Sequence, residues 1–188
     1  ASLRTRESAE LLVEGAWAAM CEGDPSLTDV VGPEDVDAFI DTARDLIGTY
    51  YTMENPRGFE AESREQHVEI DTGEVLLRGF IDRIDVAPTG EMRVVDYKTG
   101  KAPPEARALA EFKAMFQMKF YALVLWRTRG EIPKLLQLVY LGNSEIVRYA
   151  PDEQELLATE RKVQALWAAI ERSARTGDWR PSTSRLCD

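Results

Sequence analysis

The sequence predicts a mixed α/β fold of the α+β kind, in which helices pack on one mixed β-sheet. Helix and strand patterns follow one another in the order α, α, β, β, β, α, β, β, α. No internal repeat or linker-like segment divides the chain, and its 188 residues suit one domain. Hydrophobic residues make up 44% and charged residues 30% of the sequence, which is typical of globular proteins.

The first 58 residues are expected to be helical. Residues 5–22 carry apolar side chains at a spacing of four, and the run Gly-Asp-Pro-Ser at 23–26 ends this helix. Pro33 is expected to open a second helix, because proline is tolerated in a first turn. An apolar stripe at helical spacing continues from Val36 to Tyr51, and the proline at position 56 ends the helix.

Three strands are expected next, at 66–70, 74–86 and 92–98, joined by turns into an antiparallel meander. A helix over 105–129 and strands over 134–141 and 145–150 follow. The last helix runs over 152–175, with Asp152 as its N-cap and Gly177 at its C-terminal end. We therefore divide the single domain, 1–188, into a helical part (1–58), a core (60–150) and a C-terminal helix and tail (151–188).

The charge is uneven along the chain. The net charge is −10, which speaks against a general polyanion binder. Residues 1–74 contain 5 basic and 18 acidic residues, whereas residues 98–134 contain 8 basic and 3 acidic ones. The basic stretch fits either a local anionic ligand or a solvated helix face.

Location and redox state follow from what the sequence lacks. No apolar run has the length of a membrane span, and the first residues do not resemble a secretory signal, so a cytoplasmic protein is expected. Cys21 and Cys187 form no CxxC pair, and a disulfide framework is not expected. Cys21 is expected to be a small buried or half-buried residue.

The segment most informative about chemistry is 79–101, GFIDRIDVAPTGEMRVVDYKTGK. Asp96 and Lys98 are two apart on a strand, so they share a face at roughly 6.5–7 Å along it. Asp82 lies on the preceding strand and is expected to point inward between Phe80 and Ile84. Carboxylates in apolar surroundings are costly unless they are paired or bind a cation, so two of them predict a divalent metal with oxygen ligands.

Lys98 is then expected to act in catalysis beside that metal. Its ammonium group can orient a water molecule or stabilise the transition state of phosphate chemistry. The alternative from the residues alone is an ordinary Asp96–Lys98 ion pair, with Asp82 bridging to Arg83 or Arg78.

At these residues the segment resembles the nuclease domain of the RecB-family exonucleases, within the PD-(D/E)XK superfamily. The G-x-x-D-R motif of that family is matched by Gly79, Asp82 and Arg83. Its D-Y-K-T-G motif is matched by residues 96–100, and its Q-x-x-x-Y motif by Gln117 and Tyr121. The resemblance covers roughly residues 60–188 and implies a restriction-endonuclease-like αβββαβ core, here with extra N-terminal and C-terminal helices.

The resemblance also implies roles. Asp82, Asp96 and the main-chain carbonyl of Tyr97 would ligate magnesium or manganese, and Lys98 would be the catalytic lysine. The remaining motif residues, Gln117, Tyr121 and Arg83, would brace the site or touch DNA. The implied function is a metal-dependent DNA exonuclease of recombination or repair, working with DNA and with a helicase or another recombination protein as partners.

Two features depart from the family pattern. The family usually has a metal-binding histidine on a helix upstream of these strands, but the only histidine here, His67, lies on a predicted strand and is expected to be a surface or core residue. The family helix is therefore expected before Ala1, in a chain truncated at both ends. Many relatives also hold an iron–sulfur cluster with four cysteines, of which Cys187 is expected to be a remnant, so a cluster is possible only in a longer form of the protein.

Other chemistries fit poorly, because the sequence has no P-loop, no G-x-S-x-G elbow and no H-E-x-x-H motif. Two functions compete with a nuclease. One is a non-catalytic DNA-binding module with a decayed nuclease fold, and the other is a structural domain with no role in nucleic-acid chemistry.

Overall fold

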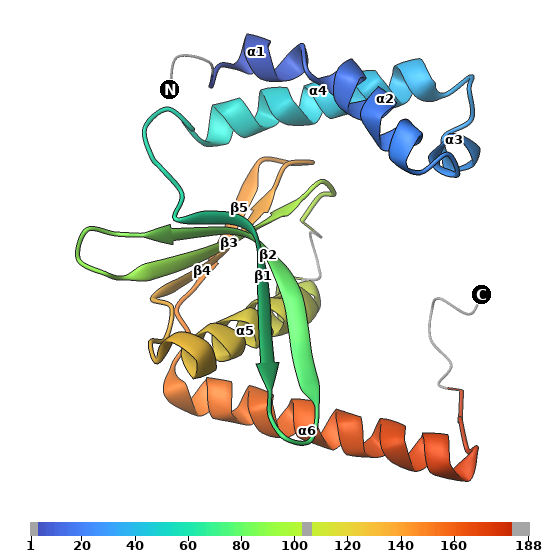
Figure 1. The fold of residues 1–188 in the computed structure, drawn as a ribbon. Coiled ribbons are helices and arrows are strands. Elements are labelled where there is room, and N and C mark those ends of the chain that lie inside the picture. The colour runs from blue at the N-terminus through green and yellow to red at the C-terminus, as the bar shows by residue number, and fades with distance from the viewer. Residues whose placement is uncertain (1–3, 103–106, 182–188) are drawn as a thin grey trace.

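The computed structural model describes residues 4–102 and 107–181, with side chains from 115 onward in the second range. Figure 1 shows a twisted sheet with helices on both sides. The N-terminal helices are α1 (Arg6–Glu10), α2 (Val13–Gly23), α3 (Leu27–Val30) and α4 (Val36–Met53). The strands are β1 (Ser63–Asp71), β2 (Leu76–Val86), β3 (Met92–Lys98), β4 (Leu135–Tyr140) and β5 (Glu145–Tyr149). The remaining helices are α5 (Arg107–Arg129) and α6 (Glu153–Thr176).

The sheet has the order β1-β2-β3-β4-β5. Neighbours pair antiparallel except β3 and β4, which are parallel and joined by the crossover helix α5. The predicted mixed sheet and meander are therefore confirmed. From α4 onward the elements run α, β, β, β, α, β, which is the predicted αβββαβ order.

Central burial explains why β4 is apolar at every position except Gln137, a buried residue that accepts a hydrogen bond from Arg148. Residues 136–140 are all buried, and Leu136 and Leu138 are fully so. A parallel strand covered on both faces needs apolar side chains in both directions, which removes the alternation of a one-sided strand.

The N-terminal prediction needs two corrections. The helix expected over 5–22 breaks at Leu11 and Leu12, where the amide of Leu12 bonds back only three residues, to Ala9. Pro33 does not open a helix: it follows Gly32 in a turn closed by the Asp35 amide on the Gly32 carbonyl, and α4 begins at Val36. Proline favours the second position of such a turn as much as a first helical turn.

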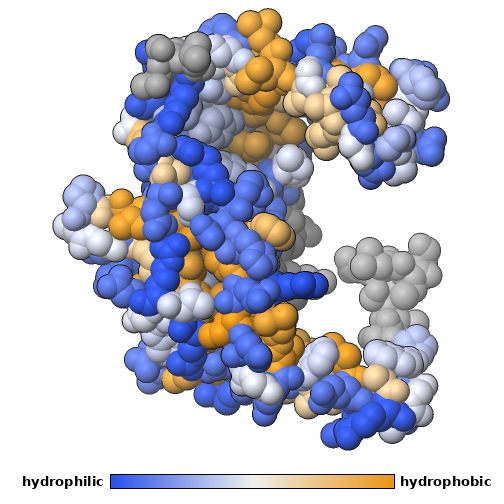
Figure 2. Space-filling view, viewed as in Figure 1, coloured by the Kyte–Doolittle hydropathy of each residue, from blue (hydrophilic) through white to orange (hydrophobic). Residues whose placement is uncertain are grey.

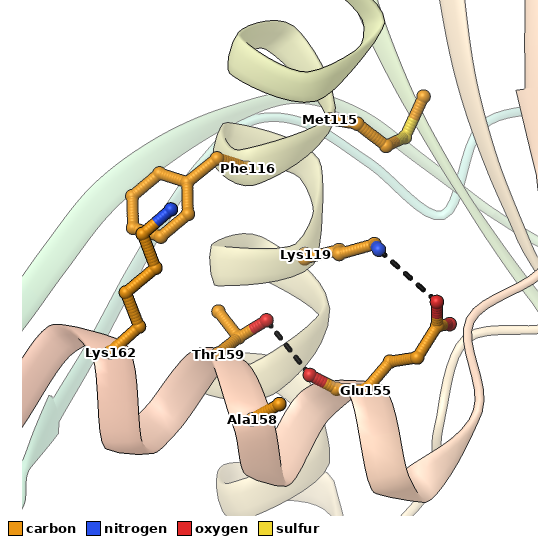
Figure 3. A pocket seen from close by; sticks show the side chains of 7 residues that line it. All are labelled: Met115, Phe116, Lys119, Glu155, Ala158, Thr159 and Lys162. Carbon is orange, nitrogen blue, oxygen red and sulfur yellow. Dashed lines mark hydrogen bonds and ion pairs between the residues drawn. The ribbon is translucent and has the colours of Figure 1, made fainter. Parts of the chain in front are cut away.

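Helix α6 begins and ends as expected. Asp152 and Glu155 form a capping box, and Gly177 closes the helix in a left-handed conformation with φ 70°. Its first turns pack against α5, where Lys119 Nζ lies 3.2 Å from Glu155 Oε1 (Figure 3). Thr159 donates a hydrogen bond to the carbonyl of Glu155 in the same view.

The surface is mixed. In the space-filling view, hydrophobic residues gather over the N-terminal helices and where the sheet meets α5 and α6 (Figure 2). Among the described residues, no helix combines the length and the apolar character needed to cross a bilayer.

Candidate active site

The two motif carboxylates lie where β2 and β3 separate. The paired positions of these strands end at Arg83 opposite Val95, and Asp82 and Asp96 are the next residue on each strand. The amide of Tyr97 donates a hydrogen bond of 2.8 Å to Asp82 Oδ2. The hairpin therefore brings both carboxylates to one point, as the sequence predicts.

The surroundings of Asp82 differ from the prediction. Ile84 is fully buried, but Phe80 is 59% exposed and its ring contacts His67. The strict alternation assumed for β2 therefore does not hold between these two residues. Opposite Asp82 in the register, Glu65 of β1 has φ 47°, a left-handed conformation that locally distorts the strand pair.

A chain of polar contacts runs from Asp96 to α5. Lys98 Nζ lies 2.7 Å from Asp96 Oδ2 and donates a hydrogen bond of 3.1 Å to Gln117 Oε1. Gln117 Nε2 in turn donates to the hydroxyl of Tyr121 at 2.8 Å. A side chain at Gly79 would begin 3.0 Å from the Tyr121 ring, so the motif glycine lets β2 approach this helix closely. The structure thus joins all three sequence motifs in one site.

Asp96 has an incomplete set of partners. Its carboxylate is buried, and Oδ2 has no hydrogen-bond donor in good geometry among the described residues, although the Lys98 ammonium is close. Burial raises the pKa of Asp96, Lys98 acts against this, and the nearby charge of Asp82 adds to it. A cation between the two carboxylates would supply the missing charge.

The donor set fits a small hard cation. Mg²⁺ is commonly held by one or two carboxylates and otherwise by water and substrate phosphate. The described residues contain no cluster of three or more His, Cys, Asp or Glu side chains able to hold a metal. The ligand set of Asp82, Asp96 and the Tyr97 carbonyl therefore stays a prediction.

Sequence reasoning missed Glu54, at the end of α4. Arg83 donates two hydrogen bonds to its carboxylate, at 2.7 and 3.0 Å, and the Tyr97 hydroxyl donates a third at 2.7 Å. Arg83 also contacts the Tyr97 hydroxyl directly. Burial alone would raise the pKa of Glu54, but these hydrogen bonds hold it below its ordinary value. No motif contains Glu54, and only the tertiary packing of α4 identifies it.

Arg83 therefore braces α4 and β3 rather than Asp82. Its guanidinium is buried, packs on the Phe59 ring at 4.5 Å and lies 3.1 Å from Asp85 Oδ1. None of the ion pairs between described residues includes Asp82, so the alternative in which Asp82 bridges to Arg83 or Arg78 is wrong. The other half of that alternative, the Asp96–Lys98 ion pair, is present.

The remaining predicted residues lie outside this cluster. His67 is an exposed residue of β1, 3.9 Å from Glu69, as expected for a strand-surface histidine. Helix α4, the helix directly upstream of the strands, contains no histidine. Cys21 is half-buried, as expected, whereas Cys187 lies outside the described residues.

A mixed sheet that presents two converging carboxylates and a lysine, braced by a helix behind it, defines the class of restriction-endonuclease-like nucleases. The family model of the PD-(D/E)XK nuclease superfamily matches residues 2–188, and the chain belongs to that superfamily.

Individual proteins also resemble this chain. The chain is 41% identical over 71 residues to the Gene 69 protein of Mycobacterium phage D29, a match that covers 37% of this chain and 23% of the phage protein. The crystal structure of a "Putative exonuclease" from Eubacterium rectale matches 97% of this chain and 70% of that one, with a TM-score of 0.62 and 14% identity, a likeness of fold. The crystal structure of SSO0001 matches 84% of this chain and 70% of that one, with a TM-score of 0.40 and 19% identity.

Proposed function

We propose that this chain is a divalent-metal-dependent DNA nuclease related to the RecB-family exonucleases, hydrolysing phosphodiester bonds in recombination or repair. The observation that carries the proposal is the contact chain Asp96–Lys98–Gln117–Tyr121, with Asp82 held beside it by the Tyr97 amide. DNA is the proposed substrate, and the cytoplasm is the proposed location. A helicase or another recombination protein is the proposed partner.

Magnesium or manganese bound between Asp82 and Asp96 would supply Lewis-acid activation of the phosphodiester and of the attacking water. Lys98 places a positive charge at the edge of this site, where 31% of its side chain is exposed and can meet a phosphate oxygen. Gln117 accepts a hydrogen bond from the Lys98 ammonium group, and the hydrogen bond that it donates to Tyr121 fixes the orientation of its amide. Lys98 is therefore held in place before the substrate arrives.

The network behind the strands has a separate task. Glu54 and Arg83 contact the Tyr97 hydroxyl, and the main-chain amide of the same residue donates to Asp82. Its carbonyl would be a ligand of the proposed metal. Glu54, Arg83 and the Tyr97 ring thus act as positioning residues, because they set the backbone of β3 between Asp96 and Lys98.

Cleavage of labelled DNA with Mn²⁺, Mg²⁺ or a chelator tests the proposal. We expect cleavage only with metal, and a loss of at least about a hundredfold in Asp96→Asn and in Lys98→Ala. Asp71→Asn is the matched control, since Asp71 is an exposed carboxylate at the far end of β1. Both site variants cleaving at the parental rate would refute the mechanism.

The Asp96–Lys98 ion pair is the observation that favours a second candidate, a DNA-binding module without cleavage. In such a module Lys98 would remain the counter-charge of Asp96 permanently. DNA binding without cleavage under any metal condition would decide for it, and an absence of DNA binding would decide for a structural domain.

A further inference from the structure

A cleft of about 780 Å³ lies between α1, α4 and the sheet, and Asp82 forms part of its wall. Tyr97 and Leu141 line it from the sheet, and Tyr50 and Tyr51 line it from α4. This volume lies within the range of small-molecule sites, about 300–1,000 Å³. Asp82 belongs both to the proposed metal site and to the cleft wall. A ligand bound at the metal site therefore lies next to the cleft.

The charge of the cleft wall is opposite to that of the segment that builds it. Residues 1–74 contain 18 acidic and 5 basic residues. Two of those five basic residues, Arg4 and Arg64, line the cleft, and none of the acidic ones does. The sheet adds Arg83 and a single carboxylate, Asp82. This selection of arginines from an acidic segment indicates an anionic ligand.

Both arginines are held by one exposed carboxylate. Glu60 accepts hydrogen bonds from Arg4 at 2.9 Å and from Arg64 at 3.1 Å, and 67% of its side chain is exposed. These hydrogen bonds lower the pKa of Glu60. Exposed ion pairs of this kind contribute little to stability, so a phosphate group can compete with Glu60 for the two guanidinium groups.

The aromatic lining offers one ring for stacking. Arg83 covers the ring of Phe59, and Tyr50 packs edge-on against Tyr97 at 5.8 Å between centroids. Tyr51 is half-buried, contacts Tyr50 edge-on and takes no part in the Glu54–Arg83 network. Its ring is the one that a ligand in the cleft can cover.

We propose that this cleft holds unpaired nucleobases of the DNA strand whose phosphate lies at Asp82 and Asp96, with Tyr51 as the stacking platform and Arg4 and Arg64 on flanking phosphates. Aromatic rings with adjacent arginines are how proteins hold single strands, since every base has a π-face. In a duplex those faces are covered by neighbouring base pairs and only the base edges are accessible. The inference rests on the proposed nuclease function, which supplies the phosphate at Asp82.

Binding without cleavage tests the cleft by itself. The full chain is titrated, with chelator present, into a fluorescein-labelled oligothymidylate and into an oligonucleotide carrying 2-aminopurine, whose emission falls on stacking. We expect quenching by the parent, about tenfold weaker binding and no quenching in Tyr51→Ala, and retention of both in Tyr51→Phe. Arg64→Gln should weaken binding and reduce the slope of log K against log salt by about one.

Glu60→Gln gives a result of the opposite sign, because it removes the carboxylate that competes with DNA phosphate: binding should become tighter. Two variants outside the cleft are controls, Phe39→Ala and Arg44→Gln. In the native chain the Phe39 ring packs on Trp17 and Arg44 pairs with Glu14. Both should bind like the parent. Damage to the fold would weaken binding in every variant and would not produce a gain in Glu60→Gln.

The outcomes separate this inference from the proposed function. Metal-dependent cleavage combined with parental binding by Tyr51→Ala and no 2-aminopurine quenching would overturn the cleft and leave the nuclease standing. Quenching that depends on Tyr51, in a chain that cleaves under no metal condition, would support the cleft and refute the nuclease.

Discussion

Replacing Glu54 with glutamine removes a buried negative charge while keeping the shape of the side chain. The side chains of Glu54 and Arg83 are 10% and 4% exposed, so water cannot take over the lost interaction. In the variant the NH2 group of the glutamine amide replaces one carboxylate oxygen, so one guanidinium N–H of Arg83 faces a donor instead of an acceptor. Breaking a buried ion pair by removing one partner costs about 3–5 kcal/mol, and the lower end applies because Arg83 keeps Asp85 at 3.1 Å.

Urea unfolding followed by circular dichroism measures this loss. We expect Glu54→Gln to lower the free energy of unfolding by about 3 kcal/mol, which for a chain of this size corresponds to about 6–12 °C in melting temperature. The matched control is Glu62→Gln, which breaks an exposed pair with Arg129 at 2.9 Å and should cost less than about 1 kcal/mol. If both variants unfold at the same urea concentration as the parent, α4 is not anchored to β3 through Glu54.

The remaining predictions concern other contacts. Gly142→Ala should destabilise the fold by about 1–3 kcal/mol, measured by urea unfolding, because the new Cβ would lie 2.7 Å from the carbonyl of Gly100. The control Gly15→Ala, with open space around it in α2, should be neutral or stabilising. Equal effects of the two substitutions would refute the steric argument. The hydrogen bond from Tyr149, with further bonds from Asp152 and Lys119, lowers the pKa of Glu155, so its contribution to stability is present at neutral pH and lost as pH falls below its ordinary pKa. Unfolding of Glu155→Gln between about pH 7 and about pH 4 should therefore differ from the parent most at neutral pH, and a constant difference would contradict this sign.

Local patterns in the sequence were enough to predict the sheet and the capped last helix. The meander follows from turns at 71–73 and 87–90, and the capping box at Asp152 is a local signal. The helix break at Leu11 and Leu12 was missed because both residues are apolar, as the residues of a buried helix face would be. In the structure they are 83% and 69% exposed. Hydrophobic spacing reports which residues are apolar and not whether they are covered.

The site shows the same division between local and tertiary information. Asp82, Asp96 and Lys98 come together because two hairpin strands fix their register, which sequence spacing predicts. Glu54 reaches the site from a helix 29 residues before Arg83, and its contact depends on how α4 packs on the sheet. The exposure of Phe80 likewise depends on the distortion opposite Asp82, which no local pattern encodes.

The most direct test of the central claim is anomalous scattering from a crystal of this protein soaked in Mn²⁺. The account predicts a peak between the carboxylates of Asp82 and Asp96, with Lys98 still bonded to Gln117, and no peak in Asp96→Asn. A soaked crystal with no manganese between these carboxylates, and with Lys98 still 2.7 Å from Asp96 Oδ2, would contradict it.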